Sequence, residues 1–116
     1  MMPPAPNLMR TVVRLRNKIE RTDDALMALL VRRVELARQV GRAKERAGLP
    51  MLDPAREARV VRWAAARARE LGIPQESVRA LFWGIIAMCR NEQVRETRAD
   101  QRAPARRSAK RAAPNA

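Results

Sequence analysis

The sequence contains no histidine and a single cysteine, Cys89. One cysteine cannot form a disulfide within the chain, and without histidine the usual clusters of soft metal ligands cannot be assembled. We therefore expect no metal site. The absence of histidine also removes Ser-His and Cys-His nucleophile pairs and the commonest general base at neutral pH. Any enzymatic activity must therefore proceed without these groups.

Long apolar runs are also missing. No stretch approaches the roughly 20 residues that span a membrane, and the first ten residues lack the hydrophobic core of a signal peptide. We therefore expect no membrane association and a cytoplasmic location. Aromatic residues amount to only two Trp and one Phe, so the core must be built from Leu, Ile, Val, Met and Ala.

Glycine and proline are concentrated at the chain ends and in two short stretches, residues 48–54 and 72–74. These stretches separate three segments with helical periodicity, and no strand pattern occurs, so we predict an all-α fold. Asn7 can cap the first helix, while Asp53 and Pro54 suit the start of the second. The predicted helices span about residues 7–46, 54–71 and 75–96.

The first predicted helix is unusually long. At about 1.5 Å per residue it measures roughly 60 Å, about twice the diameter of a small domain. Its own chain cannot cover an apolar seam of this length, so we expect an intertwined antiparallel homodimer. The seam residues recur at gaps of three and four, with polar interruptions at Thr22 and Arg33: Leu8, Val12, Leu15, Ile19, Leu26, Leu29, Leu36 and Val40.

The formal net charge of +13 is unevenly distributed. Residues 97–116 hold six Lys or Arg against one acid, without periodicity, and are predicted to be a disordered basic tail. A nucleic-acid-binding arm is the alternative interpretation of this tail. The expected organisation is therefore a flexible lead (residues 1–7), a helical domain (8–96) and the tail.

Cations interrupt the apolar seam of the first helix. Arg33 and Lys44 lie within about 20° of the same helix face and about 16 Å apart along the axis. Arg16 is about 25 Å before Arg33, too far to share a small ligand within one chain. In an antiparallel dimer paired about position 27, however, position 16 of one chain falls opposite position 38 of the other. Three cations would then converge in each of two shared sites; otherwise Arg33 and Lys44 extend into water.

Further polar candidates follow the first helix. Asp53, Arg56 and Glu57 open the second helix, where capping explains Asp53 and exposed first-turn charge could explain the other two. On the third helix, Gln93 follows Cys89 by four residues, which places an amide on the apolar face, where it must find a partner. Cys89 itself is expected to pack as a small apolar residue.

The assembled site is cationic and rich in hydrogen-bond donors, with Glu57 as the one acceptor. Such a site suits a small dicarboxylate that carries a hydroxyl. Because no nucleophile or proton shuttle is evident, the best fit is a reaction that needs a held conformation and a stabilised developing charge, such as a pericyclic rearrangement.

The chain resembles the all-helical chorismate mutase family, in its short, monofunctional three-helix type. The resemblance covers about residues 8–96 without a gap. It is carried by Leu15-Arg16-Asn-Lys-Ile19, Asp23, Leu26, Leu29-Leu30, Arg33, Glu35-Leu36, Val40-Gly41, Lys44, Pro50, Asp53, Arg56-Glu57, Leu81-Phe82, Ile85-Ile86 and Gln93.

The resemblance implies conversion of chorismate to prephenate by a Claisen rearrangement, without a cofactor, in Phe and Tyr biosynthesis. It implies that Lys44 and Gln93 donate to the ether oxygen and that Glu57 accepts from the ring hydroxyl. The other implied substrate contacts are Arg16 of the partner chain, Arg33, Arg56, the backbone of Asp53, and Cys89 at a position where many relatives carry Ser.

Two groups of alternatives remain open from the sequence. An isochorismate pyruvate-lyase or an aminodeoxychorismate mutase would use much the same cationic site, although Glu57 suits a substrate hydroxyl. A basic helical dimer that binds nucleic acid is the more distant alternative, and nucleic acid is not the expected partner. That alternative predicts binding that falls steeply with added salt, and no consumption of chorismate.

Overall fold

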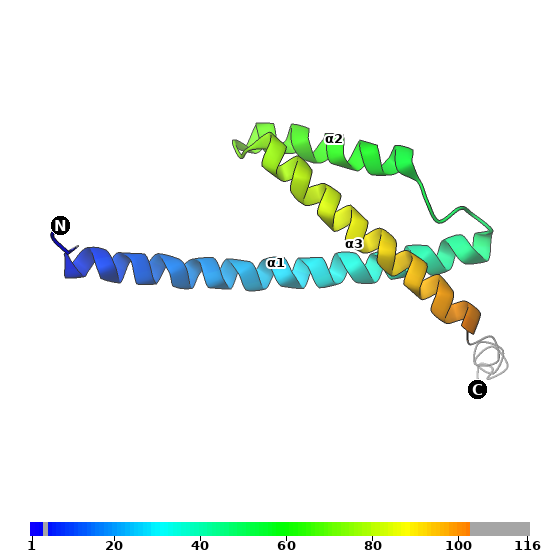
Figure 1. Cartoon of the computed structure of the whole chain (residues 1–116), viewed down its shortest axis with the longest axis horizontal. Helices are drawn as coiled ribbons and strands as arrows, with labels where there is room; N and C mark the ends of the chain where they lie inside the picture. The colour runs from blue at the N-terminus through cyan, green and yellow to red at the C-terminus, as the bar shows by residue number, and fades with distance from the viewer. Residues whose placement is uncertain (4, 103–116) are drawn as a thin grey trace. The chain divides into compact units, whose positions relative to one another are not determined.

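The computed structural model describes residues 1–3 and 5–102, and within them the chain forms three helices (Figure 1). These are α1 (Pro6–Ala47), α2 (Pro54–Leu71) and α3 (Gln75–Arg102). The described residues contain no strand, so the predicted all-α fold with one very long helix is confirmed. The predicted ends of the first two helices agree with the observed ends to within one residue.

The ends of the helices follow local chemistry. Pro6 occupies the first helical position of α1, where its missing N–H is not needed, and Ala5 O accepts from the N–H groups of Leu8 and Met9 at 3.0 and 3.1 Å. α2 ends at Gly72, whose φ of 73° is left-handed and therefore favours glycine. The N–H of Gly72 donates to Arg69 O, which closes the turn toward α3.

The third helix is longer than predicted. It continues to Arg102 rather than ending near Glu96, so the first six residues of the predicted tail are helical. No glycine or proline interrupts residues 97–102, and most of them are good helix formers. Residues 103–116, which complete the tail prediction, lie outside the described residues.

The chain divides into two units, residues 1–33 and residues 34–116. The described part of the first unit is a lead followed by the first 28 residues of α1. Ten of its large apolar side chains beyond the two leading methionines are 39–66% exposed. They are Leu8, Met9, Val12, Val13, Leu15, Ile19, Leu26, Met27, Leu29 and Val31.

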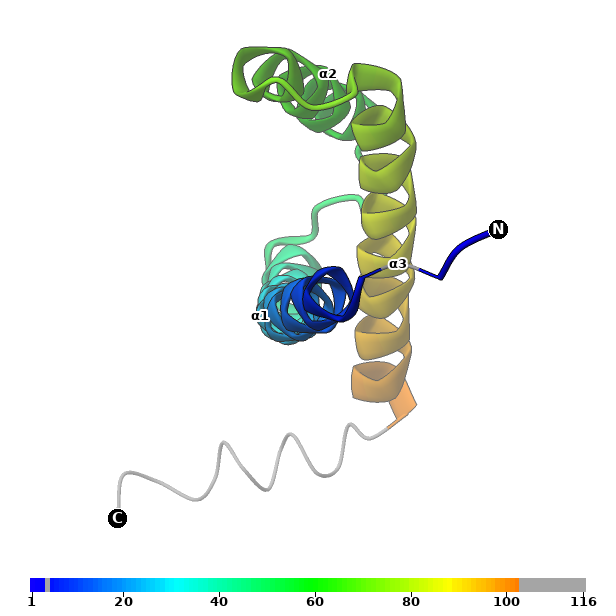
Figure 2. The ribbon, with the colours of Figure 1, turned by 90° about the vertical axis from the view of Figure 1, so that its left-hand side faces the viewer.

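The second unit contains the end of α1 together with α2 and α3. A short turn joins α2 and α3 into a helical hairpin (Figure 2). The rings of Trp63 and Phe82 meet edge to face across it, with centroids 6.2 Å apart. Small side chains dominate the buried positions, which lets the helices approach closely: Ala37, Val61, Ala64, Ala65, Ala68, Ile86 and Cys89. Among the described residues, no helix is both long and apolar enough to cross a membrane.

Candidate active site

The structure brings the two predicted catalytic residues together. Lys44 lies near the end of α1 and Gln93 in the second half of α3, and both side chains are half-buried. Lys44 Nζ donates to Gln93 Oε1 at 3.1 Å, across 49 positions of sequence. The prediction that the Gln93 amide finds a partner is therefore confirmed.

The close approach of α1 and α3 depends on Gly41, one turn before Lys44. A Cβ on Gly41 would lie 3.0 Å from the backbone oxygen of Gln93 and 3.1 Å from its Cα. Carbon atoms in ordinary contact are about 3.5–4.0 Å apart, so the missing side chain is what permits this crossing. Gly41 thus places the Lys44 ammonium within reach of the Gln93 amide.

A second contact fixes the Lys44 ammonium from the loop side. Lys44 Nζ donates to Met51 O at 2.9 Å, in the segment between α1 and α2. Thr97 Oγ1 lies 3.1 Å from Gln93 O and 3.5 Å from Met51 Sδ, and so links the same loop to α3. The ammonium is therefore held by two acceptors that come from different elements.

The predicted cluster at the start of α2 divides into two parts. Asp53 Oδ1 accepts from the N–H of Arg56 at 3.1 Å, which confirms the predicted N-cap. The Asp53 and Arg56 side chains are exposed, whereas Glu57 is half-buried and turned toward α3. Glu57 forms an ion pair with a residue of another helix, α3.

The partner of Glu57 is Arg90, a residue that the sequence reasoning missed. Arg90 Nε donates to Glu57 Oε2 at 3.0 Å, and Arg90 Nη2 donates to Oε1 at 2.8 Å. These hydrogen bonds, followed by the charge of Glu57, raise the pKa of Arg90 above that of ordinary arginine. The signal was available, because Arg90 follows the buried Ile86 by four residues and so lies on the inner face of α3.

The remaining predicted residues are Cys89, Arg16 and Arg33. Cys89 is 3% exposed, as expected for a small apolar residue. Arg16 is exposed and Arg33 half-buried, and both belong to the first unit. Their approach to the residues of the second unit stays a prediction.

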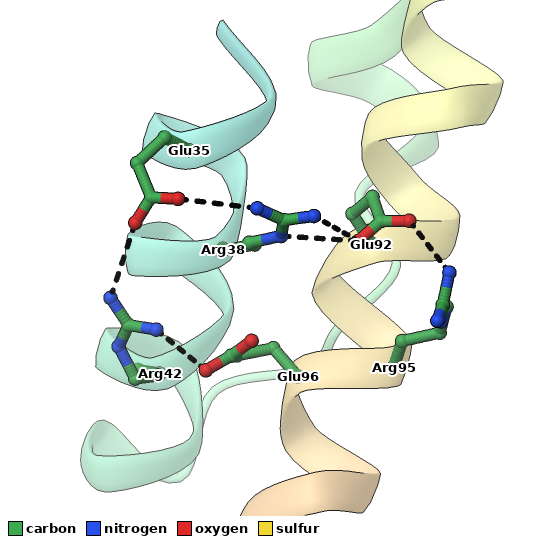
Figure 3. A network of polar contacts seen from close by, with 6 residues as sticks. All are labelled: Glu35, Arg38, Arg42, Glu92, Arg95 and Glu96. Atoms are coloured by element: carbon green, nitrogen blue, oxygen red, sulfur yellow. Dashed lines mark hydrogen bonds and ion pairs between the residues drawn. The ribbon is translucent and has the colours of Figure 1, made fainter. Parts of the chain in front are cut away.

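An ion-pair network joins the second half of α1 to α3 (Figure 3). Arg38 Nε donates to Glu92 Oε2 at 3.1 Å, and Arg42 Nη1 donates to Glu96 Oε1 at 2.6 Å. The hydrogen bonds to Glu92, and next those to Glu35, raise the pKa of Arg38 above that of ordinary arginine. The network contains six residues: Glu35, Arg38, Arg42, Glu92, Arg95 and Glu96.

The donors and charges suit an anion rather than a metal. Among residues 1–3 and 5–102, no group of three His, Cys, Asp or Glu could hold a metal ion. The chain matches the family model described as chorismate mutase type II over residues 15–94. The chain belongs to this family. All eight predicted site residues fall within the matched range.

Several proteins of known name resemble the chain over part of its length. It is 41% identical to the T-protein of Enterobacter agglomerans over 64 residues, which are 55% of this chain and 17% of that protein. It is 32% identical to the bifunctional chorismate mutase/prephenate dehydratase of Aquifex aeolicus over 84 residues, which are 70% of this chain and 23% of that protein. The chain thus spans about a fifth of these two relatives.

A relative of similar size is named for a different substrate. The chain is 34% identical to the 4-amino-4-deoxychorismate mutase of Streptomyces venezuelae over 82 residues. The alignment covers 70% of this chain and 80% of that protein. Similarity to this chain therefore extends to a protein named for a substrate with an amino group on its ring.

Proposed function

We propose that this chain is a chorismate mutase that converts chorismate to prephenate by a Claisen rearrangement, without a cofactor. The observation that supports this best is the convergence of Lys44 and Gln93. Within the described residues, Met51 O and Gln93 Oε1 take two of the three N–H donors of Lys44, which leaves the third for a ligand. With its Oε1 accepting, the Gln93 amide can donate through Nε2.

These two donors suit the charge that develops in the reaction. As the C–O bond of the ether breaks, negative charge grows on the ether oxygen, and donors fixed in advance stabilise it without reorganising. The Lys44 ammonium is fixed by contacts to the loop and to α3, which is the kind of preorganisation required. Removing a single aimed donor of this type costs about 10²–10³ in turnover.

The other residues of the proposed site bind and orient the substrate. Arg33 of one chain and Arg16 of the partner chain hold the substrate carboxylates, and Arg56 adds a further cation. Glu57 accepts from the ring hydroxyl beside the backbone of Asp53. Cys89 takes the remaining substrate contact, for which its thiol is a weak donor.

The proposed site requires a homodimer. A single helix cannot bury its own apolar seam, and the seam of residues 1–33 is largely exposed in one chain. A second copy of α1, antiparallel to the first, would cover this seam and bring Arg16 toward Arg33 and Lys44. The mass in solution, measured by light scattering, is therefore expected to be twice that of the chain. A cytoplasmic location belongs to the same proposal.

A second candidate function is rearrangement of the amino-substituted substrate. The relative from Streptomyces venezuelae, named 4-amino-4-deoxychorismate mutase and aligned over 80% of its length, favours it. The ring substituent is then an amino group instead of a hydroxyl. Lys44 and Gln93 would donate to the ether oxygen as in the first candidate.

One experiment separates these possibilities. The purified protein is incubated separately with chorismate, isochorismate and 4-amino-4-deoxychorismate, and the products are identified by mass spectrometry and NMR. Prephenate formed from chorismate is the expected result. Pyruvate released from isochorismate alone would indicate a lyase, and turnover of the amino compound alone would favour the second candidate. If no compound is consumed, the proposed function is wrong.

A further inference from the structure

Arg90 of α3 and Glu57 of α2 form a bidentate ion pair between the two helices. Arg90 Nε and Nη2 each donate a hydrogen bond to a different carboxylate oxygen of Glu57, at 3.0 and 2.8 Å. The side chains of Arg90 and Glu57 are only 34% and 20% exposed. A bidentate pair that is partly removed from water fixes the orientation of the carboxylate.

The pair changes what Glu57 can bind. A carboxylate oxygen has two lone pairs, so Glu57 can still accept a hydrogen bond from a hydroxyl while Arg90 holds it. Its negative charge, however, is already neutralised by the adjacent guanidinium. An unpaired carboxylate attracts an ammonium group strongly, whereas the neutralised pair does not, and Arg90 itself repels a cation that approaches Glu57.

The position of Arg90 brings it to the proposed site. It lies one residue after Cys89 and one turn before Gln93 on α3, and its partner Glu57 lies one turn into α2, after the Asp53 cap. All of these residues belong to the second unit. The charge of Arg90 therefore acts at the point where the ring substituent of the substrate would meet Glu57.

We propose that Arg90 is a positioning and specificity-determining residue: it orients Glu57 to accept from a ring hydroxyl and disfavours a substrate that carries an ammonium group there. This inference rests on the proposed function and names the substrate class within it. An aliphatic amine is largely an ammonium ion at neutral pH, so the discrimination is between a neutral donor and a cation. The raised pKa of Arg90 is consistent with a guanidinium that stays charged in the pair.

The test compares two substrates in the wild type and three variants. kcat and KM are measured for chorismate and for 4-amino-4-deoxychorismate with the wild type, Arg90→Leu and Arg90→Lys. Arg95→Leu is the matched control, because it also removes an α3 arginine paired with a glutamate, Glu92, but does not touch Glu57. Thermal unfolding by circular dichroism monitors the fold of each variant.

We expect Arg90→Leu to shift the ratio of kcat/KM values toward the amino substrate by about tenfold or more, which corresponds to one hydrogen-bonded charge. For chorismate, KM should rise while kcat changes little, since the hydroxyl contact is the same before and during bond breaking. Arg95→Leu should keep the wild-type ratio. Arg90→Lys keeps the charge but loses the bidentate geometry, so it should keep the ratio and raise KM for chorismate.

Several results would overturn the inference. An unchanged substrate ratio in folded Arg90→Leu, with chorismate turned over normally, would show that Arg90 is only structural while leaving the proposed function intact. An equal shift of the substrate ratio in Arg95→Leu would show that the shift comes from the loss of any positive charge on α3 and not from Arg90 in particular. Should Arg90→Leu not fold, an unchanged KM for chorismate in Arg90→Lys would decide against the positioning role. A wild type that rearranges neither compound would overturn both proposals.

Discussion

Substituting Gly41 by alanine should displace the proposed catalytic pair more than it destabilises the fold. The new Cβ would lie 3.0, 3.1 and 3.3 Å from O, Cα and Cβ of Gln93. Two of these atoms belong to the backbone of a helix and cannot rotate away. To restore ordinary contacts of about 3.5 Å, α1 and α3 must separate by about 0.5 Å at the crossing.

The energy of this change can be estimated from two opposing terms. Overpacking of a close contact costs about 1–3 kcal/mol. Replacing glycine by alanine inside a helix returns about 1 kcal/mol. The expected net loss is therefore about 1 kcal/mol, or a decrease in Tm of about 4–8 °C for a domain of this size.

The effect on the site should be larger. A separation of about 0.5 Å would lengthen the Lys44 Nζ to Gln93 Oε1 distance from 3.1 Å to about 3.6 Å, outside hydrogen-bond geometry. Because misplacement of about 1 Å can cost about 10² in rate, we expect kcat for chorismate to fall at least about tenfold. The assay combines steady-state kinetics with thermal unfolding at one fixed protein concentration, since the stability of the proposed dimer would depend on concentration.

Gly84→Ala is the matched control for Gly41→Ala. Gly84 also lies inside a helix, but a Cβ there meets no atom within 4 Å. This control should raise Tm slightly and leave kcat unchanged. If Gly41→Ala is as stable as Gly84→Ala and keeps wild-type turnover, the close crossing is not what positions Lys44, and the reasoning is refuted.

Three further predictions concern the proposed site. Lys44→Ala or Gln93→Ala should lower kcat by about 100-fold or more with an unchanged circular dichroism spectrum, and near-normal turnover in both would remove them from the mechanism. Mixed Arg16→Ala and Arg33→Ala chains, refolded together, should regain about one good site per heterodimer; no regained activity would contradict the shared site. Asp53→Ala should lose about 1 kcal/mol of unfolding free energy in a denaturant titration, whereas Asp53→Asn keeps the cap and most of the stability.

The helices were largely predictable because their signals are local. Glycine and proline mark the ends of α1 and α2, and the Asp53 cap was recognised from its position before Pro54. The predicted end of α3 near Glu96 is wrong, because a basic composition without periodicity does not by itself end a helix. Helix propensity without a breaker carries the chain on to Arg102.

The site was only partly predictable. The face positions of Lys44 and Gln93 followed from helical periodicity, but periodicity does not say which faces meet. Arg90 was not predicted because its partner Glu57 lies on another helix, 33 positions away, and no local pattern pairs the two. A half-buried carboxylate such as Glu57 requires a cation or donor, and the inner face of α3 supplies one.

The sequence by itself determined the three helices, the apolar seam of the first helix and the family to which the chain belongs. These follow from backbone propensity and from residue patterns along one chain. Only the tertiary structure decided that Lys44 meets Gln93 and that Arg90 meets Glu57, across 49 and 33 positions. The physical reason is that such contacts depend on how helices cross, and the crossing is set by packing at Gly41 rather than by any local signal.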